Sequence, residues 1–321
     1  MRKLVKSNRG VLLIPLFAIF AAVSIVYMPG TVRAQIYVGS AGGIGEYTTS
    51  GTSVWNDGGF GAIAAAISGT NLFVANENNG TIGEYTTAGT TVNSSLISVS
   101  CSGLAVSGTD IYVCEGDSIA EYTTSGVLVT STLITGLSAL SGGAYSIAVS
   151  GTDIFVGFNG NAGAGRIGEY TTSGGTVDDS LVTGLAVTEA YGIAVSGSDI
   201  FVTSQNNGTF GEYTTSGGTV SAAVLPDFSI NSPWGIAVSG TDVYVTSDNN
   251  GTVGEYTTAG GTVNSALITG LNQPQAIVAV PEPSAFTMLA AGFGLLFLFG
   301  GSSDLQARFS RQNRKRMKIF S

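Results

Sequence analysis

Between residues 35 and 280 the hydrophobic residues lie in short runs, and Gly, Asn, Asp and Ser separate one run from the next. The runs are rich in Val, Ile, Thr and Tyr, which favour β-strands, and the separating residues are those that form tight turns. No stretch of this region combines helical periodicity with capping residues. The pattern therefore predicts an all-β domain made of short strands.

The strand-like runs follow one another in a fixed order of four. GIAVSG at 192–197 precedes DIFVTS at 199–204, and the next repeat continues with GTVGEYTT at 251–258 and GTVNSALI at 261–268. The first two runs are apolar on both faces, as expected of strands that neighbouring sheets cover on both sides. Ser-Gly-Thr-Asp at 239–242 joins such a pair as a hairpin turn. Each unit thus predicts a four-stranded antiparallel sheet.

The third run marks how often the unit recurs. It contains GEYTT or AEYTT six times, with tyrosines at Tyr47, Tyr85, Tyr122, Tyr170, Tyr213 and Tyr256. Successive tyrosines are 37 to 48 residues apart by subtraction, close to the length of one four-stranded propeller blade. QIYVGS at 35–40 lacks a first run ahead of it, and the missing run is QAIVAV at 275–280. We therefore predict a six-bladed β-propeller over 35–280, whose last strand joins the first blade and closes the ring.

The repeat also carries a resemblance to a known family. PWGIAV at 233–238, followed by DVYV and NNGTVGEY, resembles the NHL-type propeller repeat. The resemblance extends over essentially all of 35–280 and implies the same propeller fold. In the third strand Glu stands where that family commonly has basic residues.

The N-terminal end differs from the repeat in composition. Four basic residues within 1–9 precede an uncharged apolar run at 11–27, and Val-Arg-Ala at 32–34 offers the small residues that a signal peptidase reads. This pattern predicts a signal peptide over 1–34. An uncleaved signal anchor is the alternative.

The C-terminal end, 281–321, has three parts. Pro281, Glu282 and Pro283 precede an uncharged apolar stretch at 285–301, and a tail with six Lys and Arg residues follows. At 1.5 Å per residue this stretch would form a helix of about 26 Å, enough to cross a thin bilayer. The basic tail is expected to stay in the cytoplasm.

These three parts, in this order, resemble the PEP-CTERM sorting signal of Gram-negative bacteria, a segment also called the ice-binding protein C-terminal domain. The resemblance implies export, tethering in the inner membrane by the C-terminal helix, and processing by an exosortase near the PEP motif. It further implies a final place in the cell envelope or extracellular matrix of a host that makes extracellular polysaccharide.

Charge narrows the choice of partners. Region 35–280 holds 19 acidic residues against one basic residue, Arg166, which gives a net charge of −18. Such a surface repels nucleic acid and anionic membranes, whereas cations and neutral ligands remain possible partners.

The absence of histidine limits the chemistry. Without His the chain has no Ser-His-Asp or Cys-His nucleophile and no His-based zinc site. We therefore expect no catalytic residues and no enzyme. The alternative is a calcium-dependent lactonase or hydrolase that would use Glu77, Asp248 and neighbouring Asn residues at the channel mouth, so calcium is the one cofactor left open.

Cys101 and Cys114 flank one predicted hairpin. In an exported protein they are candidates for a disulfide. A pair of buried free cysteines is the alternative.

The candidate binding residues follow from propeller geometry, because the residue just before the innermost strand borders the mouth of the central channel. Alignment on GIAV places Tyr145, Tyr191 and Trp234 there in three consecutive blades. The other blades have Gly61, Ser102 and Gln275 at this position. Aromatic rings beside amide and hydroxyl groups suit a neutral sugar. The predicted ligand-binding set is Tyr145, Tyr191, Trp234, Gln275 and Arg166; the alternative is that the rings fill interfaces between blades.

The acidic residue of the repeated pentapeptide recurs at Glu46, Glu84, Glu121, Glu169, Glu212 and Glu255. One arginine cannot neutralise all six. They are therefore solvated, hydrogen-bonded to hydroxyls and backbone, or weak calcium ligands.

Together these features predict an exported, non-enzymatic binding or scaffold protein of the cell surface or matrix. Polysaccharide is its candidate ligand, and signal peptidase and exosortase are its expected processing partners.

Overall fold

The computed structural model describes residues 35–280 apart from 141–142, 159–164, 186–189, 206 and 227–228. The predicted signal peptide at 1–34 lies outside these residues, as does the sorting segment at 281–321 with Pro281, Glu282 and Pro283. Within the described part of the chain, no helix has the length and hydrophobicity needed to span a membrane.

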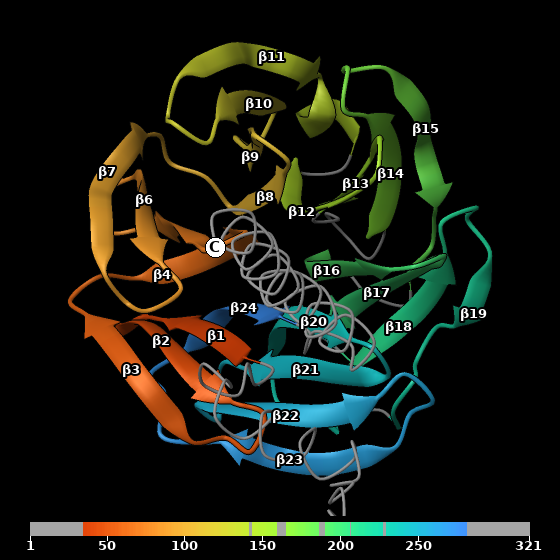
Figure 1. The fold of residues 1–321 in the computed structure, drawn as a ribbon. Helices are drawn as coiled ribbons and strands as arrows, with labels where there is room; N and C mark the ends of the chain where they lie inside the picture. Colours follow the sequence, from red (N-terminus) through yellow and green to blue (C-terminus); the bar gives the residue numbers. More distant parts are fainter. Residues whose placement is uncertain are drawn as a thin grey trace, which may run out of the picture. The chain divides into compact units, whose positions relative to one another are not determined.

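In this part of the chain, strands β1–β24 form six antiparallel four-stranded sheets, which surround a common axis like the blades of a propeller (Figure 1). Blade 1 comprises β24 (Pro274–Val280), β1 (Gln35–Ser40), β2 (Gly43–Thr48) and β3 (Ser53–Gly58). Blade 2 comprises β4 (Ala62–Ser68), β5 (Asn71–Asn76), β6 (Thr81–Thr86) and β7 (Thr91–Ser98). Blade 3 comprises β8 (Gly103–Ser107), β9 (Asp110–Cys114), β10 (Ser118–Thr123) and β11 (Leu128–Thr135).

The remaining blades repeat the same order from the axis outward. Blade 4 comprises β12 (Ala144–Ser150), β13 (Asp153–Phe158), β14 (Arg166–Thr171) and β15 (Thr176–Val182). Blade 5 comprises β16 (Ala190–Ser196), β17 (Asp199–Ser204), β18 (Thr209–Thr214) and β19 (Thr219–Ser221). Blade 6 comprises β20 (Pro233–Ser239), β21 (Asp242–Ser247), β22 (Thr252–Thr257) and β23 (Thr262–Ile268). A short 3₁₀ helix, η1 (Leu137–Leu140), lies between blades 3 and 4. The prediction of six four-stranded blades is confirmed.

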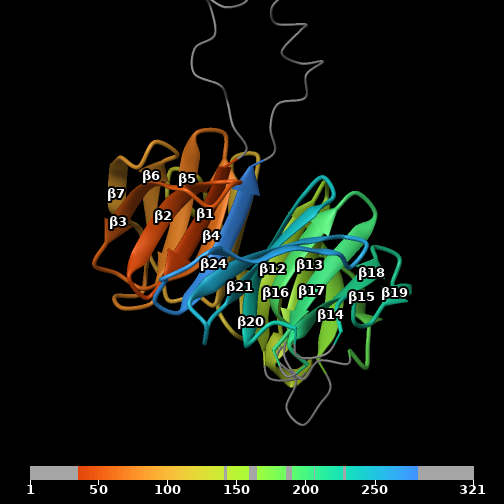
Figure 2. The ribbon, with the colours of Figure 1, turned by 90° about the horizontal axis from the view of Figure 1, so that it is seen from below.

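The ring closes as the sequence predicts. β24 pairs antiparallel with β1, so that Gln35 lies opposite Val280 and Val38 lies opposite Ile277. The two strands lie side by side in both views of the ribbon (Figure 2). Residues 35 and 280 therefore meet at one corner of blade 1, on the face opposite the end where β24 begins at Pro274.

The glycine of the GIAV run is required where the innermost strands approach one another near the axis. A Cβ on Gly192 would collide with the backbone carbonyl of Trp234, and one on Gly235 with that of Gln275. The same atom on Gly103 would lie 2.8 Å from the carbonyl oxygen of Tyr145. The absent side chain thus lets the blades converge.

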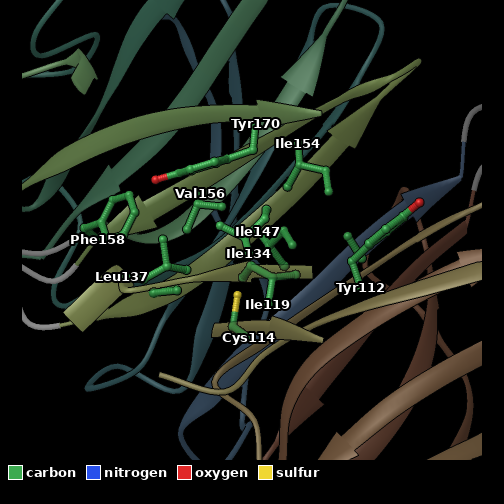
Figure 3. Packing of buried hydrophobic residues seen from close by; sticks show 12 residues of the cluster. Tyr112, Cys114, Ile119, Ile134, Leu137, Ile147, Ile154, Val156, Phe158 and Tyr170 are labelled. Atoms are coloured by element: carbon green, nitrogen blue, oxygen red, sulfur yellow. The ribbon is translucent and has the colours of Figure 1, made fainter. Parts of the chain in front are cut away.

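The hydrophobic core lies between neighbouring blades. The cluster shared by blades 3 and 4 contains Cys114 and Ile119 from one blade and Val156 and Tyr170 from the next (Figure 3). The second strands are buried on both faces, as the sequence predicts, whereas the outermost strands expose valines such as Val177 and Val263. The tyrosine of the repeated pentapeptide is buried in five blades and partly buried in blade 3. This residue therefore serves the packing between blades.

Candidate binding site

Three aromatic side chains meet at the mouth of the central channel. Tyr145, Tyr191 and Trp234 lie near the beginnings of β12, β16 and β20, and each is half-buried. The Tyr191 and Trp234 ring centroids are 4.3 Å apart at 31°, and the Tyr145 ring meets Tyr191 edge-on at 4.8 Å. Tyr145 and Trp234 are 6.0 Å apart. The three rings thus form one cluster across three blades.

Hydroxyl groups from neighbouring blades fix the backbone of this cluster. The buried Thr203 Oγ1 accepts the Gly192 N–H at 2.8 Å and donates to the Trp234 carbonyl at 2.7 Å. Ser146 Oγ donates in the same way to Ala190 O at 2.8 Å, one residue before Tyr191. Because these bonds are buried, they hold the inner strands, and with them the rings, in a set position.

A cavity of about 430 Å³ opens beside the rings. Tyr145 and Trp234 form its aromatic wall, and Gln275 and Ser102 contribute an amide and a hydroxyl. Tyr191 contacts both rings but is not part of the cavity wall. The structure therefore brings three of the five predicted ligand-binding residues to one cavity and places Tyr191 directly behind it.

Two carboxylates also line the cavity, and they come from equivalent positions of adjacent blades. Glu77 directly follows β5, and Glu115 directly follows β9. A Cβ on Gly61 would lie 2.9 Å from Glu77 Cγ, so the missing side chain of Gly61 leaves room for Glu77 at the mouth. Tyr122 donates its hydroxyl hydrogen to Glu115 Oε1 at 3.4 Å.

Sequence analysis considered Glu77 for a calcium site and missed Glu115. The available signal was positional: both residues, like Asp248, come immediately after the second strand of a blade.

Asp248 supports the site from behind the cavity wall. Burial raises the pKa of its carboxyl, and a side-chain hydrogen bond with Gln275 opposes part of that rise. The Asp248 N–H donates to Ser232 O at 3.0 Å. Among the described residues, Asp248 Oδ1 is buried without a hydrogen-bond partner.

Arg166 lies apart from the cavity wall. Its guanidinium carbon stacks 4.7 Å from the centroid of the Phe158 ring, and Nε and Nη2 are buried without a hydrogen-bond partner in the part of the chain that the structure describes. Burial raises the pKa of nearby Tyr170 to about 12, although the positive charge of Arg166 opposes the rise. The structure does not bring Arg166 together with the other four predicted residues.

The six repeated glutamates occupy the third strand of each blade, so they are distributed around the ring. Glu46 is only 4% exposed and accepts a hydrogen bond from Gln35 Nε2 at 2.7 Å. Burial is the first cause of a raised carboxyl pKa at Glu46, Glu121, Glu169, Glu212 and Glu255. In all of these except Glu46, the Asp that begins the second strand adds to the rise. Among described residues, no group of three or more acids or cysteines is arranged to hold a metal ion.

The two cysteines are free thiols in the structure, and both are buried at the cavity. Gly103 lies opposite Cys114, so the predicted hairpin register is correct. Burial, with the charge of Glu115 as a second cause, raises the pKa of Cys101 to about 12, and burial holds the pKa of Cys114 well above its ordinary value. Thiols of this kind react slowly as nucleophiles.

The fold defines the protein as a six-bladed β-propeller with a polar and aromatic cavity at its channel mouth. No protein-family model matches the chain, and no curated protein sequence matches it significantly.

Solved structures show the same fold. A chain of the nidogen–laminin complex is similar with a TM-score of 0.65 and 12% identity, covering 77% of this chain and 98% of that one. A calcium-binding protein, regucalcin, from Agrobacterium tumefaciens gives 0.53 and 14%, covering 68% and 77%. A Bacteroides caccae protein of unknown function gives 0.55 and 12%, covering 77% and 99%. At these identities the likeness concerns the fold alone.

Proposed function

We propose that the protein is a non-enzymatic binding module that takes up a polysaccharide chain at the channel mouth. The observation that carries this proposal is the cluster of Tyr145, Tyr191 and Trp234 beside a cavity of about 430 Å³ that also presents Gln275 and Ser102. Cavities of roughly 300–1,000 Å³ with aromatic walls and a few polar groups are typical of ligand sites. The buried thiols and the lack of histidine give the site no ready nucleophile and base.

The proposal includes export and sorting. Residues 1–34 act as the signal peptide, and 281–321 tether the chain through a helix at 285–301 until an exosortase processes it at Pro281–Pro283. The propeller supports this arrangement in one respect. Both terminal segments attach where Gln35 pairs with Val280, on the face opposite the channel mouth. Residue 280, after which the proposed tether begins, therefore lies at the opposite end of β24 from the cavity residue Gln275.

A glycan array followed by calorimetry tests the binding function. Trp234→Ala removes the largest ring of the cluster and should weaken oligosaccharide binding about tenfold, the effect of losing roughly 1.4 kcal/mol. Trp55→Ala, which removes the other tryptophan from outer strand β3, is the matched control and should bind as the unaltered protein does. Equal loss in both variants, or no oligosaccharide binding at all, would contradict the proposal.

The sorting proposal has its own test. Replacing Pro281, Glu282 and Pro283 by Ala should leave the precursor at its full length and in the membrane fraction of a host that has an exosortase. Processing of the substituted chain to the same size as the original would show that the PEP motif is not the signal.

The second candidate function is a calcium-dependent hydrolase. It is favoured by the position of Glu77 and Asp248 just after second strands at the mouth and by the fold shared with a calcium-binding protein. Turnover of a lactone panel that a chelator abolishes would support this candidate in place of the binding module.

A further inference from the structure

The channel mouth is chemically divided into two halves. The innermost strands follow one another around the axis in the order β24, β4, β8, β12, β16 and β20. The rings of Tyr145, Tyr191 and Trp234 come from the last three of these blades. Glu77 and Glu115 come from the blades of β4 and β8. In this order the blade of Glu115 lies across the axis from that of Trp234, and the blade of Glu77 lies across from that of Tyr191.

The carboxylates of the acidic half have no positive partner in the described structure. Arg166 is the only Lys or Arg in 35–280. It stacks on Phe158 and does not line the cavity. A neutral ligand that filled the cavity would remove water from Glu77 and Glu115 without supplying a counter-charge, which is unfavourable.

The aromatic half is shaped differently from a flat sugar platform. Its rings meet at interplanar angles of 31°, 60° and 89°, so they face in more than one direction. Tyr145 and Trp234, the two rings that line the cavity, meet at 60°, and rings inclined in this way suit a cationic group, which is attracted to the negative face of each ring. Trp gives the strongest attraction of this kind, and Trp234 lines the cavity.

We propose that the channel mouth selects ligands that carry a positively charged amine, either protonated or quaternary. The amine lies between the faces of Tyr145 and Trp234 and the carboxylates of Glu77 and Glu115, while Gln275 and Ser102 bind neighbouring hydroxyl groups. This inference rests on the proposed function, since it uses the same cavity, and it names the ligand class: polysaccharide with free amino groups in preference to neutral or acetylated chains.

The test compares ligands that differ in charge but little in size. Calorimetry at pH 6 would use a glucosamine tetramer and its fully N-acetylated counterpart, together with choline and 3,3-dimethylbutanol, its uncharged isostere. The charged member of each pair should bind about tenfold more tightly at low salt, and the difference should shrink as salt is added.

Charge-neutral variants locate the effect. Glu115→Gln and Glu77→Gln should each reduce the preference for the charged ligand several-fold, because each weakens binding of the glucosamine tetramer and removes the cost of covering a carboxylate with the N-acetylated tetramer. Glu77 is exposed, so its variant is expected to fold even if that of half-buried Glu115 does not. Asp178→Asn is the matched control, because it removes the same charge from exposed outer strand β15 and should leave the affinity for both tetramers unchanged.

The outcomes separate this inference from the function on which it rests. If the N-acetylated tetramer binds as tightly as the amine and Trp234→Ala weakens it, charge selection is wrong and the binding function stands. If choline binds better than its isostere but no oligosaccharide binds, polysaccharide is not the ligand and the inference of charge selection stands. If no probe binds, both are wrong.

Discussion

The body of the propeller and its channel mouth differ in how similar the equivalent positions of the six blades are. In the body, equivalent positions of the blades hold the same kind of residue, such as the buried Ile154 and Ile200 at the second position of a second strand. At the mouth, the equivalent positions hold Gly61, Ser102, Tyr145, Tyr191, Trp234 and Gln275. Packing between blades requires the same kind of residue at equivalent positions of all six blades. Variation at the mouth therefore marks positions at which the fold does not determine the residue. A ligand site can therefore be built at these positions without disturbing the packing between blades.

The largest effect is expected where the body approaches the axis. In Gly192→Val the new side chain would collide with the Trp234 carbonyl, which cannot move without displacing a whole blade. We expect a loss of about 3 kcal/mol or more in unfolding free energy, or failure to fold, by urea denaturation. Gly42→Ala is the control, because its new Cβ would meet only Ser40 Oγ at 3.5 Å. Equal stability of the two variants would contradict the close approach.

The second largest effect on stability is expected when a buried side chain between blades is shortened. Ile200→Ala leaves a cavity between blades, where Ile200 is fully buried, and should lower the unfolding free energy by about 2–5 kcal/mol. Tyr191→Ala removes a larger but half-buried ring at the mouth and should destabilise less, while it weakens ligand binding. The distinction between body and mouth would fail if Tyr191→Ala were the less stable of the two in the same denaturation.

The sequence alone could predict the body almost completely and the mouth only in part. The missing first run at the N-terminal end and its counterpart at 275–280 were enough to predict the pairing of β24 with β1. The arc of Tyr145, Tyr191 and Trp234 followed from alignment on the GIAV run. These features depend on the repeat, which a single sequence displays.

The features that the sequence did not predict lie in particular loops and at strand ends. Among the described residues η1 (Leu137–Leu140) is the only helix, and the repeat does not predict it. Arg166 was a predicted ligand-binding residue, but it stacks on Phe158 and is not part of the cavity wall. Glu115 escaped prediction although it directly follows the second strand of its blade, as Glu77 and Asp248 do.

A smaller effect should appear in the dependence of stability on pH. The folded-state pKa of Glu46, Glu121, Glu169, Glu212 and Glu255 is raised above the ordinary 4.5. A raised carboxyl pKa favours the folded state when the group is protonated, so this contribution is lost as the pH rises through the folded-state values. We expect the melting temperature to be higher at pH 5 than at pH 8.

Glu169→Gln should flatten this profile, because Glu169 lies beside Asp153 and Asp178 and all three lie in the body of blade 4. A melting temperature that rises from pH 5 to pH 8 would show that buried glutamates do not govern the dependence.

The smallest effect is expected from Tyr213→Phe. Among the described residues the buried Tyr213 hydroxyl has no hydrogen-bond partner, so its removal should leave the unfolding free energy unchanged or raise it by less than about 1 kcal/mol. A loss of more than that in urea denaturation would reveal a partner for the hydroxyl. A neutral result would confirm that this body position needs the ring and not the oxygen.

The pairing of β1 with β24 also determines when the nascent chain can complete the ring. β1 is made first among the strands, yet its partner at 274–280 is made last. Until then β1 presents an open edge and the innermost position of its blade is empty. A chain that passes through a narrow pore from its N-terminus onward can therefore finish the ring only when its final repeat has emerged. An interrupted transit would leave an incomplete blade exposed for capture by chaperones or proteases.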